Sequence, residues 1–236
     1  MRKSNARVLV ISDTHFPYAH PDIVRFLRAV RDRYKPTRVV HVGDEGDFHG
    51  VSFHDKNPDL LSPGHELERM RLLMRPVFEL FPVADVAESN HGSLIFRRAK
   101  HLGLPAAALV GYRELIGAPK GWRWHPEVLL HLPDGSECMV RHGVTKDPHR
   151  WAKPLAMHTV NGHFHEDFQV KYWRTPRGLF WSMVVGCLIN DRSLAYEYNK
   201  LNVSRPIYGV GLILNSHPVL VPMLTNRNDR WTGVLP

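Results

Sequence analysis

The strongest constraint on the fold is an alternation in the first half of the chain, where short β-branched runs are separated by segments with helical apolar spacing. Buried strands are expected at Arg7–Ile11, 38–42 and Val83–Ala87, because each run is short, apolar and rich in valine. Helices are expected over 20–34 and from Pro63 onward. Strands joined through helices favour parallel pairing and an α/β fold.

The second helix is expected to have Ser62 as its N-cap, and Pro76 is expected to bend or end it. Two further helical segments, 93–102 and 106–116, should end at the glycines that follow them. Strands dominate after residue 126, and they are expected at 127–132, Glu137–Arg141, 178–188, 207–214 and 219–224. The sequence has no repeat or linker, so we expect a single domain over residues 1–236 that contains two sheets.

Several hydrophobic runs are followed directly by polar side chains of the types that bind metals. In open α/β sheets, sites form beyond the carboxyl ends of the strands, so separate segments would deliver these side chains to one edge. The last segment carries His163 and His165 one residue apart, and on a strand both would point the same way. Alone, that pair would more often be a surface strand edge, because the chain has 16 histidines. The five segments are VISDTH, HVGDEGD, DVAESNHG, CMVRHG and HTVNGHFH.

The order of these segments resembles the signature of the calcineurin-like metallophosphoesterases, which is D-x-H, G-D-x-x-D, G-N-H-[DE], H and G-H-x-H. The trailing strands are also similar to that family. The resemblance implies an α/β fold, a four-layer double β-sandwich flanked by helices, and two-metal hydrolysis of phosphate esters. The small size and the altered N-H-G motif are similar to stand-alone members that phages often carry.

The resemblance also implies two metal sites that share one carboxylate. Two divalent ions about 3.5–4 Å apart can generate a nucleophile and clamp the phosphoryl oxygens. Imidazole, carboxylate and amide ligands without thiolate suit transition ions, of which we expect Mn²⁺ first, with Zn²⁺, Fe²⁺ or Ni²⁺ as alternatives. The matching positions are Asp13, His15 and His165 for one metal, Asn90, His142 and His163 for the other, and Asp44 for the bridge.

Two further positions resemble the family's proton-transfer pair. His91 matches the non-ligand histidine that faces the leaving-group oxygen, and Asp47 would orient it and stabilise its charged form. The alternative for His91 is a loop histidine beside a ligand. Glu45 adjoins the bridge, and we expect it to be exposed rather than a ligand.

The sequence departs from the family pattern at two places. Ser89 and Gly92 replace the leading glycine and the trailing acid of the N-H motif, and Phe48 stands where the family's protein phosphatases have arginine. The second departure argues against a protein phosphatase and leaves the phosphate-binding cation unassigned. Arg97 and Arg98, on the helix that follows, are candidates, and a solvated helix face is the alternative for them.

Charge and aromatic residues favour a polyanionic substrate. The net charge is +8 and the isoelectric point is about 9.7. Basic and aromatic residues alternate in GWRWH, DPHRWAK and VKYWRTPRG, as in single-strand-binding surfaces, although core tryptophans are the alternative. We therefore expect a phosphodiesterase or nuclease acting on DNA or RNA, with Trp173, Arg174 and Arg177 touching the substrate. A nucleotide or small-molecule phosphomonoesterase and a non-catalytic interaction module are the alternatives.

No apolar run approaches the roughly 18–20 residues that span a membrane, and the run after the basic N-terminus is too short for a signal peptide. We therefore expect a cytoplasmic protein without membrane contact. Cys138 and Cys187 form no metal-binding motif and lie in apolar stretches, so buried free thiols are expected. The oligomeric state stays open.

Overall fold

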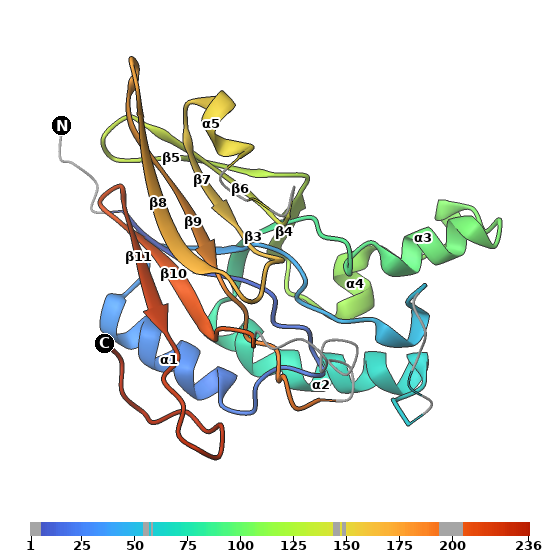
Figure 1. Cartoon of the computed structure of the whole chain (residues 1–236). Coiled ribbons are helices and arrows are strands. Elements are labelled where there is room, and N and C mark those ends of the chain that lie inside the picture. The colour runs from blue at the N-terminus through green and yellow to red at the C-terminus, as the bar shows by residue number, and fades with distance from the viewer. Residues whose placement is uncertain (1–5, 54–56, 58, 144–146, 148–149, 194–204) are drawn as a thin grey trace.

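The computed structural model describes residues 6–53, 57, 59–143, 147, 150–193 and 205–236. Two mixed β-sheets pack face to face and helices flank them, so the predicted fold class is confirmed (Figure 1). One sheet has the strand order β11-β10-β1-β2-β3-β4, and the other has the order β5-β6-β7-β9-β8. Within the described ranges, no helix is long and apolar enough to cross a bilayer.

The elements alternate between strand and helix early in the chain and are mostly strands later. The first sheet contains β1 (Arg7–Ile11), β2 (Arg38–His41), β3 (Val83–Ala87), β4 (Gly121–His125), β10 (Gly209–Leu214) and β11 (His217–Pro222). The second contains β5 (Val128–His131), β6 (Glu137–Arg141), β7 (His158–Asn161), β8 (Phe168–Thr175) and β9 (Gly178–Val185). The helices are α1 (Ile23–Tyr34), α2 (Pro63–Leu80), α3 (Leu94–His101), α4 (Tyr112–Ile116) and α5 (Ala152–Leu155), with 3₁₀ turns η1 (His49–Val51) and η2 (Ala106–Ala108).

Successive side chains of β1 point to opposite faces of the sheet, and both of these faces are buried. Val8 and Val10 belong to the apolar cluster between the two sheets. Leu9 and Ile11 belong to the cluster that α1 and α2 form against the opposite face of the first sheet. The strand pairs in parallel with β2 and antiparallel with β10, so it lies inside the sheet. Both cores of the molecule are therefore built on β1.

Helix α2 begins as the sequence predicts but does not end where a proline was expected to stop it. Pro63 is its first residue, and the Ser62 side chain accepts a hydrogen bond from the His65 N–H. The helix continues through Pro76 to Leu80. A proline removes only one hydrogen bond from the helix, and the buried apolar face of α2 stabilises the turns on both sides of it.

Three strands lie in segments that were not predicted as strands, namely β4, β7 and β8. Their sequences GWRWH, HTVN and FQVKYWRT mix charged, polar and aromatic residues, so they lack the apolar runs that revealed the other strands. The predicted helix at 106–116 is instead the turn η2 followed by α4, which starts after Gly111. Helix α1 starts three residues later than predicted, at Ile23.

The carboxyl ends of parallel strands from both sheets meet at one edge. Strands β1, β2 and β3 are parallel in the first sheet, and β6 and β7 are parallel in the second. The Asp13 N–H, after β1, donates to the Gly43 carbonyl, after β2, over 3.1 Å. The His163 N–H, after β7, donates to the Asp13 carboxylate over 2.9 Å, which joins the two sheets. This edge brings the predicted ligand segments together.

The C-terminal segment is fastened to the start of α1 by a buried carboxylate. Asp22 is fully buried, and its two oxygens accept hydrogen bonds from Arg230 Nε and Nη2 at 2.7 and 2.6 Å. The Trp231 N–H donates to the same carboxylate over 3.0 Å, and the Trp231 ring packs against Phe26. The hydrogen bonds from Arg230 hold the pKa of Asp22 well below its ordinary value.

We predict that Asp22→Asn lowers the free energy of unfolding by about 1–3 kcal/mol at pH 7, the usual worth of a charged hydrogen-bonded group. A depressed carboxyl pKa stabilises the fold above the unfolded pKa, and the benefit is lost as pH falls through the folded value, so the difference between variant and wild type should shrink below about pH 4. Denaturant unfolding measures both the loss of stability at pH 7 and its decrease below about pH 4. Asp32→Asn, which removes an exposed ion pair with Arg31, is the control and should cost under about 0.5 kcal/mol. Equal losses in the two variants would contradict the role of Asp22.

Candidate metal centre

The first cluster joins the loop after β1 to the loop after β7. Asp13 is fully buried, and its Oδ1 lies 3.1 Å from His165 Nε2 and 3.7 Å from His15 Nε2. Its Oδ2 accepts hydrogen bonds from the Ser12 hydroxyl and the His163 N–H. Donor atoms of Asp13, His15 and His165 all lie within 4.8 Å of one another. The structure therefore brings together the three residues predicted for one metal.

The second cluster adjoins the first through Asp44. Asp44 Oδ2 lies 3.0 Å from His142 Nε2, and His142 Nε2 lies 3.2 Å from His163 Nδ1. The same Asp44 oxygen lies 3.8 Å from His15 Nε2, in the first cluster. Donor atoms of Asp44, His142 and His163 again lie within 4.8 Å of one another. Asp44 thus lies between the two clusters, in the place that a bridging ligand would occupy.

Asn90 and His91 approach this centre from the loop after β3. The His91 N–H donates to Asp44 Oδ1 over 3.0 Å and so ties the loop to the shared carboxylate. Asn90 is exposed and, with His142, lines a cavity beside the second cluster. His91 Nε2 lies 4.0 Å from Asp44 Oδ2, and donor atoms of His15, Asp44 and His91 form a third group within 4.8 Å. His91 is therefore close enough to be a ligand or to act on a group bound at the centre.

His163 and His165 do not lie on a strand, contrary to expectation. Strand β7 ends at Asn161, and His163 adopts a left-handed backbone with a φ of 69°. In this turn the two imidazoles separate, since His163 contacts His142 while His165 contacts Asp13. The turn after β7 therefore places one imidazole in each cluster, and the alternation of side chains along a strand plays no part in it.

The loops that carry the clusters have an unusual backbone. Asp13, His15 and Asp44 have φ values of 48°, 47° and 52°, a region that costs a non-glycine residue about 1–3 kcal/mol. Two glycines allow the close packing around them. Gly43 has a φ of 108°, and a Cβ at Gly162 would clash with the Ser12 hydroxyl and Asp13 Oδ2. Any larger residue at these two positions would displace the loops.

Burial and the neighbouring opposite charges shift the pKa values of the centre in opposite directions. Burial lowers the pKa of His15, but the nearby Asp13 carboxylate and the hydrogen bond to Asp47 outweigh it and raise the pKa to about 10. Burial also lowers the pKa of His142, and the charges of Asp44 and Asp13 raise it to about 9. Burial raises the pKa of Asp44, yet the surrounding histidines hold it well below its ordinary value. Without metal, the raised pKa values of His15 and His142 favour imidazolium beside the carboxylates, whereas burial lowers the pKa of His163.

Asp47 contacts two histidines in different ways. Its Oδ1 lies 2.8 Å from His15 Nδ1, whereas it lies 3.6 Å from His91 Nδ1. His91 Nδ1 instead donates to the Asp47 backbone carbonyl, which leaves Nε2 of that ring directed toward Asp44. From the sequence, the Asp47 carboxylate is expected to orient His91. In the structure the Asp47 backbone contacts His91 most closely, and its carboxylate mainly holds His15.

The donor set fits divalent transition ions, because it offers imidazole nitrogen and carboxylate oxygen. His15 Nε2 is buried and has no hydrogen-bond partner among the residues that the structure describes, while the opposite ring nitrogen is held by Asp47. A carboxylate behind an imidazole is the usual arrangement of a metal-binding histidine. Cys138 and Cys187 are buried free thiols, as predicted, and neither belongs to the three donor groups.

Arg97 and Arg98 differ in their relation to the centre. The Arg98 guanidinium donates to the Val51 and Ser52 carbonyls, so it fastens α3 to the loop around η1. Arg97 is exposed and donates to the Asn90 carbonyl over 2.8 Å. The Arg98 guanidinium is therefore held by backbone carbonyls, whereas Arg97 lies beside the predicted ligand Asn90.

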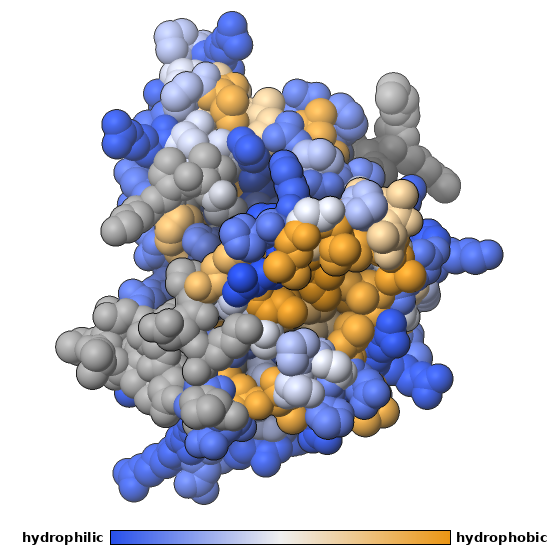
Figure 2. All heavy atoms as spheres, turned by 90° about the vertical axis from the view of Figure 1, so that its right-hand side faces the viewer, coloured by the Kyte–Doolittle hydropathy of each residue, from blue (hydrophilic) through white to orange (hydrophobic). Residues whose placement is uncertain are grey.

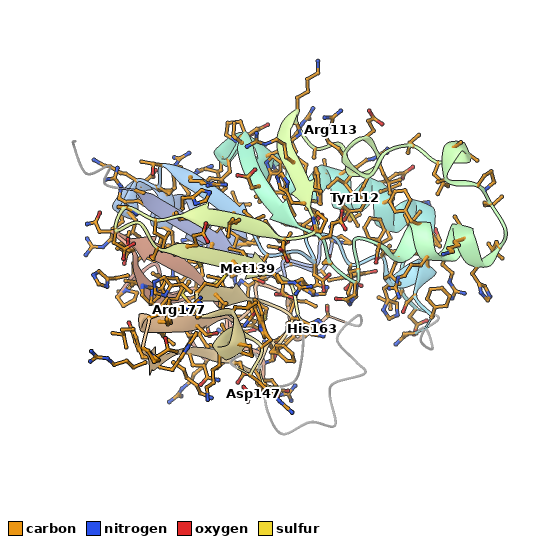
Figure 3. The ribbon with its side chains drawn as sticks, turned by 90° about the horizontal axis from the view of Figure 1, so that it is seen from above. Tyr112, Arg113, Met139, Asp147, His163 and Arg177 are labelled. Atoms are coloured by element: carbon orange, nitrogen blue, oxygen red, sulfur yellow. The ribbon has the colours of Figure 1, made fainter. Side chains whose placement is uncertain are left out.

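The β8–β9 hairpin extends away from the centre (Figure 1). A strand rises about 3.3 Å per residue, so Arg174 lies about 20 Å along β8 from Phe168, the end nearer the clusters. Arg177 follows at the hairpin turn, and Figure 3 shows it well separated from His163. Trp173 is half-buried on the same strand. The structure therefore does not bring Trp173, Arg174 and Arg177 to the metal centre.

Two residues that the sequence analysis did not assign line the cavity beside the second cluster. Glu45 is buried and not exposed as expected, and its Oε1 accepts a hydrogen bond from Trp124 Nε1 at 2.8 Å. Arg141 ends β6, directly before His142, and also lines this cavity. Each residue adjoins a predicted ligand in the sequence, and that adjacency was the only signal for them.

No protein-family model matches the sequence, and no curated protein matches it. Three solved structures are similar to the chain along most of its length. The phosphoesterase Yfce from E. coli is 12% identical, with 96% of this chain and 96% of that chain covered and a TM-score of 0.44. Vacuolar Protein Sorting 29 from Cryptosporidium parvum is 15% identical, with 98% of this chain and 94% of that chain covered and a TM-score of 0.48. The nuclease MPE from Pseudomonas putida is 11% identical, with 91% of this chain and 86% of that chain covered and a TM-score of 0.38. The two mixed sheets flanked by helices agree with the double β-sandwich that the sequence predicts.

We predict that the metal-free protein loses stability as pH rises from about 6.5 to 10. A histidine pKa that is raised on folding stabilises the fold fully below the unfolded value, and this benefit disappears as pH rises through the folded values of about 9 and 10 for His142 and His15. Bound metal requires neutral imidazole, so metal-loaded protein should not lose stability in this window. Thermal unfolding of chelated and Mn²⁺-loaded protein across this pH range measures the difference. A flat pH dependence without metal would contradict the charge network.

Proposed function

We propose that the chain is a two-metal phosphoesterase. The observation that carries the proposal is that one oxygen, Asp44 Oδ2, lies within 4 Å of donor nitrogens from both clusters, at 3.0 Å from His142 and 3.8 Å from His15. Asp13, His15 and His165 would hold one ion, and Asn90, His142 and His163 would hold the other. When bound, such ions supply Lewis-acid polarisation of a phosphoryl oxygen and a nucleophile at neutral pH.

His91 is proposed to transfer a proton to the leaving group. Its Nδ1 donates to the Asp47 carbonyl, so Nε2 is the nitrogen available to a substrate bound over Asp44. The His91 side chain is about a quarter exposed, which leaves it open to the site, whereas His15 is buried. In the charged form His91 would donate through Nε2, which lies 4.0 Å from Asp44 Oδ2.

Arg141 and Arg97 are proposed to attract the anionic substrate. Arg141 lines the cavity that adjoins His142, and Arg97 lies against the Asn90 carbonyl. The chain has a net charge of +8, which favours a polyanion over a small neutral ester. We therefore propose a phosphodiester of DNA or RNA as the substrate and Mn²⁺ as the preferred metal. The basic β8–β9 hairpin would bind a polymer at a distance from the centre and would add nothing for a single nucleotide.

Activity of purified protein with Mn²⁺, Zn²⁺, Fe²⁺ or Ni²⁺ tests this proposal directly. We predict cleavage of single-stranded DNA or RNA and of bis-nitrophenyl phosphate, with no activity after chelation. Asp44→Asn should lower the rate by more than about 100-fold, which exceeds the effect of changing a residue that only orients a ligand. Asp32→Asn on the surface of α1 is the matched control and should keep full activity. Turnover of nucleoside monophosphates without polymer cleavage would instead favour a phosphomonoesterase.

The role of His91 predicts a dependence on the leaving group. His91→Ala should slow cleavage about 10²–10⁴-fold when the leaving group is a basic alkoxide, because an unassisted alkoxide leaves poorly. Nitrophenolate leaves without a proton, so hydrolysis of its esters should change little. Rates on the two substrates and metal content are measured for the same preparation. Equal losses on both substrates would argue against proton transfer, and loss of bound metal would make His91 a ligand.

A further inference from the structure

The loop that orients His91 leads directly into the turn η1. This segment, residues 47–52, is the η1 loop. At its start the Asp47 carbonyl accepts the hydrogen bond from His91 Nδ1. Asp47 is itself fixed from the other side, because its N–H donates to the Phe16 carbonyl over 2.9 Å. The direction of the Asp47 carbonyl therefore governs which way the opposite ring nitrogen of His91 points.

The peptide that follows Asp47 has an unusual backbone. Phe48 has a φ of 56°, in the left-handed region that bulky residues rarely adopt. Such a conformation persists only where the surrounding structure holds it. The Asp47 carbonyl belongs to the peptide unit that joins Asp47 to Phe48, so a change in the φ of Phe48 would turn this carbonyl. Contacts that hold the rest of the η1 loop therefore also hold the carbonyl.

A buried side chain on α2 holds the middle of the η1 loop. Glu66 is 2% exposed, and its two oxygens accept hydrogen bonds from the His49 N–H at 2.8 Å and the Gly50 N–H at 2.7 Å. The packing is close, since a Cβ at Gly50 would lie 2.9 Å from Glu66 Oε2. Two hydrogen bonds to one planar group fix the direction of the turn as well as its position.

The end of the η1 loop is held from α3, the helix that follows His91. Arg98 Nε donates to the Val51 carbonyl over 2.8 Å, and Arg98 Nη2 donates to the Ser52 carbonyl. The Arg98 guanidinium also lies over the Phe53 ring, with its Cζ 4.0 Å from the ring centroid. The two segments are therefore joined twice, by His91 at one end and by Arg98 at the other.

Packing alone holds α3 weakly. The helix projects from the body of the molecule, and of its residues Leu94 and Ala99 are buried (Figure 1). Figure 2 shows a broad apolar surface on this side, and Leu102 and Val110, which follow the helix, are exposed. A segment with little buried apolar surface opens easily. The hydrogen bonds of Arg98 therefore matter for the position of α3 against the η1 loop.

We propose that Glu66 and Arg98 are positioning residues for proton transfer, which act on His91 through the Asp47 carbonyl. Glu66 holds the η1 loop from α2, and Arg98 holds it from α3. Neither residue belongs to the three donor groups of the metal centre. A misplacement of about 1 Å that begins far from the reacting atoms can cost about 100-fold in rate. The role in proton transfer rests on the proposed function, whereas the orientation of His91 does not.

The orientation is measured without turnover, by NMR of imidazole N–H protons in full-length protein with Zn²⁺, which is diamagnetic. A His91 Nδ1 proton that is hydrogen-bonded to the Asp47 carbonyl exchanges slowly with water, and His91→Gln assigns its signal by removing it. Glu66→Gln should speed this exchange about tenfold or more, because the amide has one acceptor oxygen for two N–H groups. Arg98→Gln should do the same, and its position on the surface of α3 keeps the test available if Glu66→Gln fails to fold.

Two exposed residues on the same helices provide matched controls. Glu68→Gln on α2 and Lys100→Gln on α3 should leave the exchange rate of the His91 proton unchanged. Absence of a slowly exchanging His91 proton in the wild type would overturn the proposal. An unchanged exchange rate in the folded variants of Glu66 and Arg98 would overturn it as well.

Hydrolysis distinguishes positioning from a general structural role. Glu66→Gln and Arg98→Gln should slow cleavage about tenfold or more when the leaving group is a basic alkoxide, and less than about twofold when it is nitrophenolate. In a His91→Ala background neither change should slow the reaction further, because both act through the same ring. Equal losses on the two esters, or losses that add to that of His91→Ala, would refute the positioning role.

The two measurements also separate this proposal from the proposed function. If the metal-loaded wild type hydrolyses neither ester while the variants of Glu66 and Arg98 speed the exchange, the phosphoesterase is refuted and the orientation of His91 by these residues is confirmed. If the wild type hydrolyses both esters and the variants change neither the exchange nor the dependence on the leaving group, the positioning role alone is refuted.

Discussion

The organisation of the molecule depends on the burial of two carboxylates where the two sheets meet. Asp13 and Asp44 are at most 1% exposed, and unpaired carboxylates at such depth would be neutral or would unfold the chain. Histidines from both sheets surround them and hold their pKa values down. The Asp13 carboxylate also accepts the His163 N–H, so the same group that would bind metal also joins the sheets. Folding and the metal centre therefore depend on one electrostatic contact region.

The segment GDEGD shows how one tight loop places three acids in three environments. Asp44 faces imidazoles of both clusters, Asp47 holds the back of His15, and Glu45 turns toward the cavity beside the second cluster. The left-handed backbone of Asp44 and the φ of 108° at Gly43 create the sharp change of direction that separates these side chains.

Much of this arrangement could be predicted from the sequence because its signals are local. Apolar runs located β1, β2 and β3, and each is followed directly by a polar segment, so the convergence of Asp13, Asp44 and His91 followed from the geometry of parallel strands. The burial of Glu45 could not be predicted, because it depends on Trp124, which is 79 residues away. The same applies to Arg174 and Arg177, whose charge suggested substrate contact, since the direction of the β8–β9 hairpin depends on its pairing with β7.

The central claim is that Asp44 lies between two metal ions, and anomalous X-ray diffraction from a crystal grown with Mn²⁺ tests it most directly. The account predicts two anomalous peaks about 3.5–4 Å apart, one among Asp13, His15 and His165 and the other among Asn90, His142 and His163, with the Asp44 carboxylate contacting both. A single peak, or two peaks that do not share Asp44, at saturating Mn²⁺ would contradict it.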